Sequence, residues 1–261
     1  MCLDSLLRQS CRDFLAAVID DASPNQEAVE CFAECRDKYS ADKRFIFLQN
    51  EKNLGASGAI NRAIEAVAGD VIMLLDADDT FPPNAVEAVT RCASAKPDRH
   101  LYFGDYTVGK EIISCRYLAM NNGGYLDKKK LADDYKLLGT TPFSREIWEK
   151  CGRFDEKTRM LNDRDFFLRI LEFPEPVGAY IPEVIYHWNI DAGQKSSSCR
   201  RYQISLMFLR YFKFFYRNMS KWNFFKNLLI HTIAIPLDWL HLFPFFHRLH
   251  AAVFNRASSS A

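Results

Sequence analysis

The chain has 261 residues, of which 48% are hydrophobic and 26% are charged, and its formal net charge is +1. This length suits one full domain with an appendage. The composition excludes a largely disordered chain, and the near-neutral charge gives the molecule as a whole no attraction for nucleic acid.

Cysteine spacing and apolar runs indicate where the protein works. No CxxC pair occurs among the eight cysteines, so we expect neither a zinc ribbon nor a disulfide framework, but reduced thiols in a cytoplasmic protein. No stretch of about 18 uninterrupted apolar residues occurs either, so the sequence predicts no membrane span. The first ten residues are amphipathic and lack the long apolar run of a signal peptide.

The first third of the chain alternates between short apolar runs and helical patterns. The apolar runs predict strands at 14–19, 44–49 and 71–75. Helices are expected at 3–10, 26–38, 59–67 and from 82 onward. This rhythm predicts an α/β fold, with a mostly parallel sheet and helices on both of its faces. Asp20-Asp21 and Asp76-Ala77-Asp78-Asp79 follow strands, at the carboxyl edge where such sheets bind ligands.

The pattern is less regular after residue 100. A hairpin is expected over 101–118, with its turn at Gly109-Lys110. Further elements are helices at 144–150 and 163–172, and a strand at 177–186 interrupted by Pro182. Long helices follow, with breaks expected near Pro236 and Pro244. We therefore expect an α/β domain over 1–195 and a helical tail over 196–261.

Three carboxylates within four residues, Asp76, Asp78 and Asp79, repel one another unless a cation or hydrogen-bond donors neutralise them. Hard divalent ions such as Mg²⁺ and Mn²⁺ prefer oxygen ligands and often bridge carboxylates to phosphates. The alternative is a solvated turn in which Asp79 or Thr80 caps the next helix.

Six motifs in order carry a family resemblance, which covers about residues 1–190. They are Asp20-Asp21-Ala22-Ser23, the stretch 53–64, the stretch 68–72, Asp76-Ala77-Asp78-Asp79, Gly152-Arg153-Phe154-Asp155-Glu156, and Asn162-Asp163-Arg164-Asp165 with Arg169. Together they closely resemble the inverting family 2 glycosyltransferases of the GT-A fold. Asn162 departs from the family pattern, which has Glu at this position.

The resemblance implies a role for each matching residue. Asp163 would be the catalytic base; the alternative is a residue that caps or balances its helix. Asp76, Asp78 and Asp79 would hold Mn²⁺ or Mg²⁺ with the donor diphosphate, and Asp21 would accept a hydrogen bond from the base. The whole donor-binding set would be Asp20, Asp21, Asn53, Gly55, Asn61, Asp76, Asp78, Asp79, His187 and Trp188. The acceptor side would include Thr140, Thr141 and Asn162. For Asn61, and for His187 with Trp188, a packing role is the alternative.

Members of this family normally begin with a strand that ends in a P-x-Y-N-like turn, whereas this sequence begins within the helix that follows it. In the family that strand lies in the middle of the sheet, so its absence would leave two neighbouring strands with unpaired backbone groups. Either Met1 is a mistaken or fragmentary start, which we favour, or the protein is a weakened relative.

The tail is basic and aromatic. Nine Lys/Arg and one acid, Asp238, follow residue 199, so the tail is near +8 and the rest of the chain near −7. An apolar stripe edged by cations comprises Phe208, Tyr211, Phe212, Phe215 and Tyr216 with Arg210, Lys213 and Arg217. The hypothesis is a helix pair within 200–261 that lies on the inner face of the cell membrane, where lipid-linked acceptors are found. The alternative is that these aromatics pack on the catalytic domain.

Three functions remain open from the sequence. The first is an active glycosyltransferase of surface polysaccharide synthesis, which takes a nucleotide-sugar donor, a UDP-sugar by preference, and a saccharide or lipid-linked acceptor. The second is a non-catalytic relative that binds a nucleotide sugar or a partner. The third is a nucleotidyltransferase, which is disfavoured because a glycine-rich, basic phosphate loop is not seen.

Overall fold

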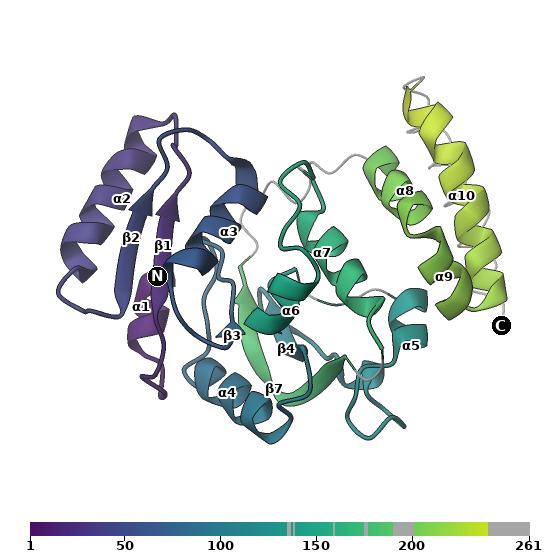
Figure 1. Cartoon of the computed structure of the whole chain (residues 1–261), viewed down its shortest axis with the longest axis horizontal. Helices are drawn as coiled ribbons and strands as arrows, with labels where there is room; N and C mark the ends of the chain where they lie inside the picture. Colours follow the sequence, from purple (N-terminus) through teal and green to yellow (C-terminus); the bar gives the residue numbers. More distant parts are fainter. Residues whose placement is uncertain (135–136, 138, 159, 175–176, 190–200, 240–261) are drawn as a thin grey trace. The chain divides into compact units, whose positions relative to one another are not determined.

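The structure, a computed structural model, describes residues 1–239 except 135–136, 138, 159, 175–176 and 190–200, with side chains for all of these but 201–203 and 233–239. The chain forms two compact units, Met1–Ala192 (unit 1) and Gly193–Ala261 (unit 2) (Figure 1). The elements of unit 1 position all the candidate site residues.

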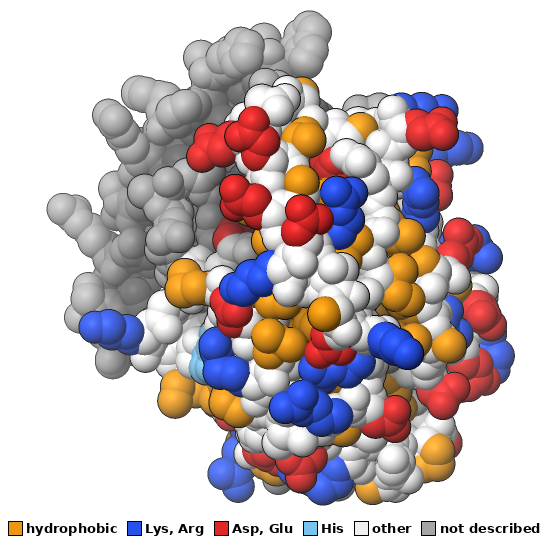
Figure 2. Space-filling view, turned by 90° about the vertical axis from the view of Figure 1, so that its left-hand side faces the viewer, with side chains coloured by type: hydrophobic (Ala, Val, Ile, Leu, Met, Phe, Trp, Pro, Cys, Tyr) orange, Lys and Arg blue, Asp and Glu red, His pale blue; other side chains and the backbone are white. Residues whose placement is uncertain are grey.

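Unit 1 opens with a small parallel sheet. Its elements are α1 (Cys2–Leu7), β1 (Ala16–Asp20), α2 (Gln26–Tyr39), β2 (Phe45–Gln49) and α3 (Gly55–Ala66). β1 and β2 pair in parallel, with Asp20 opposite Gln49. α2 and α3 lie on opposite sides of this strand pair (Figure 1), and Phe32 of α2 contacts Phe47 of β2 with ring centroids 5.8 Å apart. Acidic and basic side chains are interspersed over the face nearest α2 (Figure 2).

A mixed five-stranded sheet forms the rest of unit 1. Its strands are β3 (Val71–Ile72), β4 (Leu101–Val108), β5 (Glu111–Ile113), β6 (Phe143–Ser144) and β7 (Gly178–Trp188). β4 pairs with β7 in parallel, and the β3–β6, β4–β6 and β4–β5 pairs are antiparallel. The helices here are α4 (Ala85–Ala95), the 3₁₀ turn η1 (Arg116–Leu118), α5 (Lys128–Asp133), α6 (Arg145–Lys150) and α7 (Asn162–Leu171).

The core of unit 1 lies between the larger sheet and α7. Phe143 of β6, Phe154 and Phe166 of α7 are each at most 2% exposed. Their rings meet in one cluster, with Phe154 stacked on Phe166 at 4.2 Å. Because the first turn of α7 is held by this cluster, the residues that precede Phe166 have a fixed position.

The α/β class is confirmed, and so is the hairpin, in which Gly109 (φ +59°) turns β4 into β5. The larger sheet is more mixed than the alternating pattern predicts, because β5 and β6 are short returns that pair antiparallel. Within the described residues, β1 pairs only with β2 and β3 only with β6. In this described part of the chain, the two sheets of unit 1 therefore share no strand pairing.

A bulge lets β7 continue past Pro182. The β4–β7 register passes from Gly104 opposite Ile181 to Asp105 opposite Val184, so Pro182 and Glu183 have no ladder partner on β4. This is where a residue without an N–H fits a strand. A Cβ on Gly104 would lie 2.9 Å from the Glu183 carbonyl oxygen, so the close approach requires glycine. The strand therefore reaches Trp188 instead of ending at the proline.

Unit 2 consists of α8 (Arg201–Arg210), α9 (Phe212–Asn218) and α10 (Lys221–Trp239). α10 passes through Pro236, so the break predicted there is wrong; a proline removes one helical hydrogen bond without having to end the helix. Pro244 lies outside the described residues. Within the described part of the chain, no helix is long and apolar enough to cross a membrane.

Candidate active site

Asp21 fastens the loop after β2 to the end of β1. Its carboxylate accepts hydrogen bonds from the backbone N–H groups of Leu54 and Gly55, both at 2.8 Å, and from Asn50 Nδ2 at 2.6 Å. Asn53 Nδ2 donates to the Asp21 carbonyl at 2.9 Å. A carboxylate at the start of a helix satisfies N–H groups that have no helical partner. The structure thus brings together Asp21, Asn53 and Gly55, three predicted donor-binding residues. The Asp21 carboxylate is hydrogen-bonded to the first N–H groups of α3.

Asp20 is buried and also bonded within the chain. It accepts from Ser23 N at 3.2 Å and from Gln49 Nε2 at 3.1 Å, and these bonds, that with Ser23 foremost, hold the pKa of its carboxyl below the usual value. The N-cap of α2 is Asn25, which accepts from Glu27 N. The helix after Pro24 is therefore capped by Asn25 and not by Asp21.

The end of β7 holds the acidic loop in shape. Asp79 is 3% exposed; its Oδ2 accepts from the Tyr186 hydroxyl at 2.7 Å and its Oδ1 from Asn189 N at 2.8 Å. The Tyr186 hydroxyl also accepts from Asp76 N at 3.3 Å, and Asn189 Nδ2 donates to the Asp78 carbonyl at 2.7 Å. Asp79 is thus a structural anchor of the loop, while Asp76 and Asp78 remain exposed to solvent.

Asp76 experiences an acidic environment. Desolvation by the surrounding protein raises the pKa of its carboxyl to about 6, and Asp79, Asp78 and Asp163 add to the effect in that order. The side chain itself is solvent-accessible, so this desolvation comes from nearby protein mass and not from enclosure. The carboxylates of the acidic loop and Asp163 therefore belong to one electrostatic site.

This pKa predicts how Asp76 affects stability. Above about pH 6 the Asp76 carboxyl is charged in both the folded and the unfolded protein, so the folded state carries the full cost of desolvation and repulsion. Between about pH 6 and pH 4 the carboxyl takes up a proton in the folded protein but not yet in the unfolded one, which removes this cost. Without divalent cations, Asp76→Asn should raise the free energy of unfolding at about pH 7.5, by at most about 1 kcal/mol after solvent screening. The gain should shrink near about pH 4.

Urea unfolding at both pH values measures this effect. Asp37→Asn, which changes the same charge at an exposed position on α2, is the matched control and should leave the midpoint unchanged. Equal gains at both pH values would rule out charge repulsion at Asp76 as the cause.

Asp163 lies in the first turn of α7, against the backbone of the segment before β6. A Cβ placed on Gly139 would be 2.3 Å from Asp163 Oδ2, so the carboxylate sits directly over this glycine. Leu161 precedes the helix with φ +57°, and its side chain does not cap the first N–H groups. Asn162, also predicted for the acceptor side, is the first residue of the same helix.

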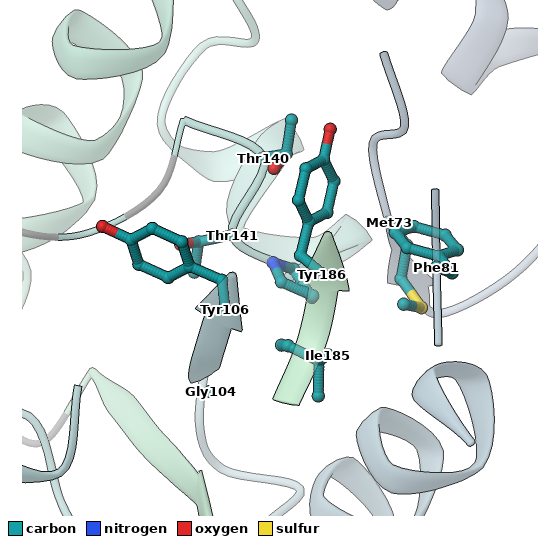
Figure 3. Close-up of a pocket in the computed structure, with 9 residues that line it drawn as sticks. Met73, Phe81, Gly104, Tyr106, Thr140, Thr141, Ile185 and Tyr186 are labelled. Atoms are coloured by element: carbon teal, nitrogen blue, oxygen red, sulfur yellow. The ribbon is translucent and has the colours of Figure 1, made fainter. Parts of the chain in front are cut away.

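A small pocket lies against the loop that follows Gly139 (Figure 3). Its empty volume is about 270 Å³, open solvent included. Thr140 and Thr141 lie on the loop that follows Gly139, and Tyr186 extends from β7. The lining residues are Met73, Phe81, Gly104, Tyr106, Thr140, Thr141, Pro142, Ile185 and Tyr186. Thr140 Oγ1 is buried with no hydrogen-bond partner in the protein. The pocket thus joins the predicted acceptor-side threonines to the tyrosine that holds the acidic loop.

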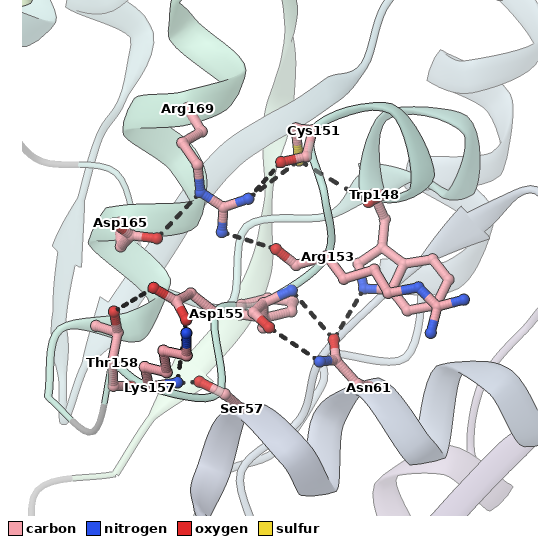
Figure 4. Close-up of polar contacts among 11 residues, drawn as sticks. Ser57, Asn61, Trp148, Cys151, Arg153, Asp155, Lys157, Thr158, Asp165 and Arg169 are labelled. Atoms are coloured by element: carbon pink, nitrogen blue, oxygen red, sulfur yellow. Dashed lines mark hydrogen bonds and ion pairs between the residues drawn. The ribbon is translucent and has the colours of Figure 1, made fainter.

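Asn61 makes the contacts that the packing alternative predicts (Figure 4). Its Oδ1 accepts from Trp148 Nε1 at 3.2 Å and from Phe154 N at 3.1 Å. Its Nδ2 donates to the Phe154 carbonyl at 2.9 Å and to Glu156 at 3.2 Å. Since the whole amide is engaged, Asn61 ties α3 to the segment after α6.

Asp165 and Arg169 form the ion pair that their i, i+4 spacing predicts. Arg169 Nε lies 3.0 Å from Asp165 Oδ2, and the carboxylate is fully buried. The same guanidinium donates to the carbonyls of Cys151 and Arg153 (Figure 4). The pair thereby fixes the turn before Phe154 against α7.

His187 and Trp188 end β7, beside the acidic loop. His187 Nδ1 is 2.9 Å from Thr107 Oγ1, and its backbone pairs with Thr80. Desolvation lowers the pKa of the imidazole. Both side chains are half-buried, so the packing alternative accounts for their contacts in the protein alone.

Tyr186 and Asn189 hold Asp79 from more than a hundred residues away. The sequence singles out their segment, Tyr186-His187-Trp188-Asn189, but roles were assigned only to His187 and Trp188.

Asp76, Asp78 and Asp79 were expected to hold a metal ion together. In the part of the chain that the structure describes, no three His, Cys, Asp or Glu side chains are grouped so as to hold a metal ion. The physical reason is that Asp79 turns inward to Tyr186.

Similar proteins were found by sequence. The chain is similar to an uncharacterized glycosyltransferase of Methanocaldococcus jannaschii, with 27% identity over 65% of this chain and 58% of the relative. It is also similar to a putative colanic acid biosynthesis glycosyl transferase of Escherichia coli, with 25% identity over 85% of this chain and 76% of the relative. The chain thus spans less than two thirds of the first of these proteins.

The fold is similar to that of S. aureus TarS. A structure of TarS residues 1–349 in complex with UDP-GlcNAc matches with a TM-score of 0.63 and 15% identity, over 80% of this chain and 61% of that one. The longer TarS chain is covered to 36%. This likeness supports the GT-A-type fold. The family model described as "Glycosyl transferase family 2" matches residues 1–138. Since this is more than half of the sequence, the chain belongs to glycosyl transferase family 2.

Proposed function

We propose that the protein transfers a sugar from a nucleotide-sugar donor, a UDP-sugar by preference, to a saccharide or lipid-linked acceptor, with inversion at the anomeric carbon. One observation carries this proposal: the Asp163 carboxylate, which lies over Gly139, is close enough to Asp76 for their charges to interact, and so adds to the rise in the pKa of Asp76 that desolvation mainly causes. A base near a diphosphate-binding loop supplies the two parts that a single displacement requires. The UDP-GlcNAc complex of TarS supports the donor class.

The acidic loop fits a divalent cation in a particular way. Asp76 and Asp78 are exposed, and a cation would offset the desolvation and the carboxylate repulsion that together raise the pKa of Asp76. Mg²⁺ is often held by one or two carboxylates, with phosphate oxygens and water completing its shell. We therefore propose Asp76 and Asp78 as direct ligands of Mn²⁺ or Mg²⁺, with Asp79 as their support. Bound there, the cation would neutralise charge on the departing diphosphate.

Asp163 would act on the acceptor. An acceptor hydroxyl gives its proton to the Asp163 carboxylate while its oxygen bonds to the anomeric carbon, and the bond from that carbon to the diphosphate breaks. The nucleoside diphosphate leaves with the electron pair, so one displacement inverts the configuration. Gly139 leaves room for the carboxylate because it has no Cβ, and the unpartnered Thr140 hydroxyl is available to a hydroxyl of the acceptor.

The compartment and pathway are also part of the proposal. All seven cysteines in the described residues are free thiols, which suits the cytoplasm. The E. coli relative is named for colanic acid biosynthesis, and a Mycobacterium tuberculosis relative, 24% identical over 72% of this chain and 70% of its own, for PGL/p-HBAD biosynthesis. We infer that this chain likewise helps to build a surface saccharide or glycolipid.

A donor panel tests the proposal. Thermal unfolding is followed with UDP-, GDP- and dTDP-sugars, with Mn²⁺ and with EDTA. A UDP-sugar at about 100 times its dissociation constant should stabilise the protein by about 2.7 kcal/mol. EDTA should remove most of this gain, and Asp78→Asn should reduce it, while Asp37→Asn should not. The non-catalytic alternative is distinguished by donor hydrolysis or transfer: binding without either reaction in a well-folded protein would favour it.

A further inference from the structure

One face of α10 carries large apolar side chains that α8 and α9 do not cover. Trp222, Phe225 and Leu229 are 76%, 63% and 63% exposed. They are spaced i, i+3 and i+7, so at about 100° per residue they fall within an arc of roughly 60°. We call Trp222, Phe225 and Leu229 the outer strip of α10.

The opposite face of α10 makes the contacts that hold unit 2 together. Phe224 is 4% exposed, and its ring lies 6.0 Å from that of Phe208 and 5.3 Å from that of Tyr216. His231 Nδ1 is 3.0 Å from Ser205 Oγ of α8. In Figure 1, α10 runs along α8 and α9. The outer strip is therefore not needed for packing among these helices.

Only part of the aromatic stripe predicted from the sequence is exposed to solvent. Phe208, Tyr211 and Phe215, members of the stripe predicted from the sequence, are buried. Phe208 and Phe215 stack on each other at 5.0 Å. Phe212 and Tyr216 are 37% and 65% exposed. Of the aromatics in the predicted stripe, only Phe212 and Tyr216 are thus exposed, whereas the three most exposed apolar side chains on one helix face of unit 2 are those of α10; Leu206 and Leu209 of α8 are also exposed, at 51% and 40%.

Cations flank the outer strip. Lys221 and Lys226 are exposed and lie about 40° beyond its two edges on the helical wheel. Lys213 and Arg217 of α9 are also exposed. Asp238 is the only acid after residue 199. The surface is therefore apolar at its centre and cationic at its rim.

We infer that the outer strip of α10 inserts into the boundary of an anionic lipid bilayer. Aromatic and leucine side chains on one face, with lysines beside them, suit a helix lying in that boundary, where the cations meet lipid phosphates. A second copy of the chain is a poorer occupant: three side chains on one helix are far fewer than the roughly 20–30 residues that each partner supplies to a standard protein interface. This inference goes beyond sugar transfer and does not depend on it.

Vesicle flotation of the full chain tests the inference, without donor or acceptor. The protein should float with phosphatidylcholine vesicles that contain about 30% phosphatidylglycerol, and much less with phosphatidylcholine alone. Lys221→Glu with Lys226→Glu should weaken binding by at least about 25-fold, roughly fivefold for each cation removed. Alanine at Trp222, Phe225 and Leu229 together should weaken it by at least about tenfold.

Matched substitutions in unit 1 show whether the loss of vesicle binding is specific to the outer strip of α10 and its lysines. Lys52→Glu with Lys129→Glu makes the same charge change at exposed positions, and Ile112→Ala removes an apolar side chain that is 62% exposed. Both controls should float as the unaltered protein does. No flotation with anionic vesicles, or equal losses in the controls, would overturn the inference. Self-association that the triple alanine variant abolishes, without lipid binding, would assign the strip to a second copy instead.

Discussion

Asp163→Asn should abolish transfer while leaving donor binding intact. Removal of a general base costs about 10²- to 10⁴-fold in rate, so we expect kcat to fall by about 10³-fold. UDP should bind within about twofold of its original affinity, because the base acts on the acceptor and not on the donor. Steady-state transfer and calorimetry of UDP binding measure the two effects.

Gly139→Ala provides an independent route to the same site. Its Cβ would lie 2.3 Å from Asp163 Oδ2, so the carboxylate must move. A displacement of this size at a reacting group lowers the rate by about 10²-fold. Asp37→Asn is the control for loss of one carboxylate and should keep full activity. If Asp163→Asn transfers normally and binds UDP normally, another residue is the base.

Arg169→Ala should be among the most destabilising single substitutions in unit 1. It removes the cation from the fully buried Asp165 carboxylate and also two hydrogen bonds to the carbonyls of Cys151 and Arg153. Loss of one partner of a buried ion pair costs about 3–5 kcal/mol. Urea unfolding should show this loss as a lower midpoint with an unchanged slope.

An exposed ion pair with the same spacing is the control. Lys150 and Glu146 are paired at i, i+4 on α6, with side chains 54% and 56% exposed. Lys150→Ala should therefore cost less than about 0.5 kcal/mol. Replacing both buried partners, Asp165→Leu with Arg169→Met, should restore part of the loss, since no charge is then left buried. Equal effects of Arg169→Ala and Lys150→Ala would contradict the structural role of the buried pair.

The sequence predicted the features that depend on local spacing. The strand–helix rhythm, the turn at Gly109 and the Asp165–Arg169 pair each arise from residues a few positions apart, and the structure confirms them. The position of the acidic loop after a strand was also readable, although only Val71 and Ile72 of that strand are paired.

What the sequence could not supply depends on contacts between distant segments. Tyr186 reaches Asp79 only because a bulge at Pro182 lets β7 continue, and no local pattern predicts that bulge. Asn61 was placed at the donor by motif, but its amide is engaged by a segment about ninety residues later. In the tail, helical spacing grouped the aromatics, whereas tertiary packing decided which of them are buried.

The three aspartates of the acidic loop have different roles. The Asp79 carboxylate accepts hydrogen bonds from Tyr186 and Asn189, and these bonds hold the loop in place. Asp76 and Asp78 stay at the surface, and desolvation, with the charges of the neighbouring carboxylates, raises the pKa of Asp76, from which we expect a cost in stability in the free protein. Functional sites commonly carry such a cost, which the bound ligand removes. The raised pKa of Asp76 is thus the physical link between the stability of the loop and its proposed ligand.

A crystal structure with UDP and Mn²⁺ tests the central claim most directly, because manganese can be located by its anomalous scattering. We predict one manganese peak at about 2.0–2.3 Å from a carboxylate oxygen of Asp76 or Asp78, bridged to the diphosphate, with Asp163 facing the same pocket. A diphosphate and metal bound away from the acidic loop, or bound there with Asp163 pointing out of the pocket, would contradict the account.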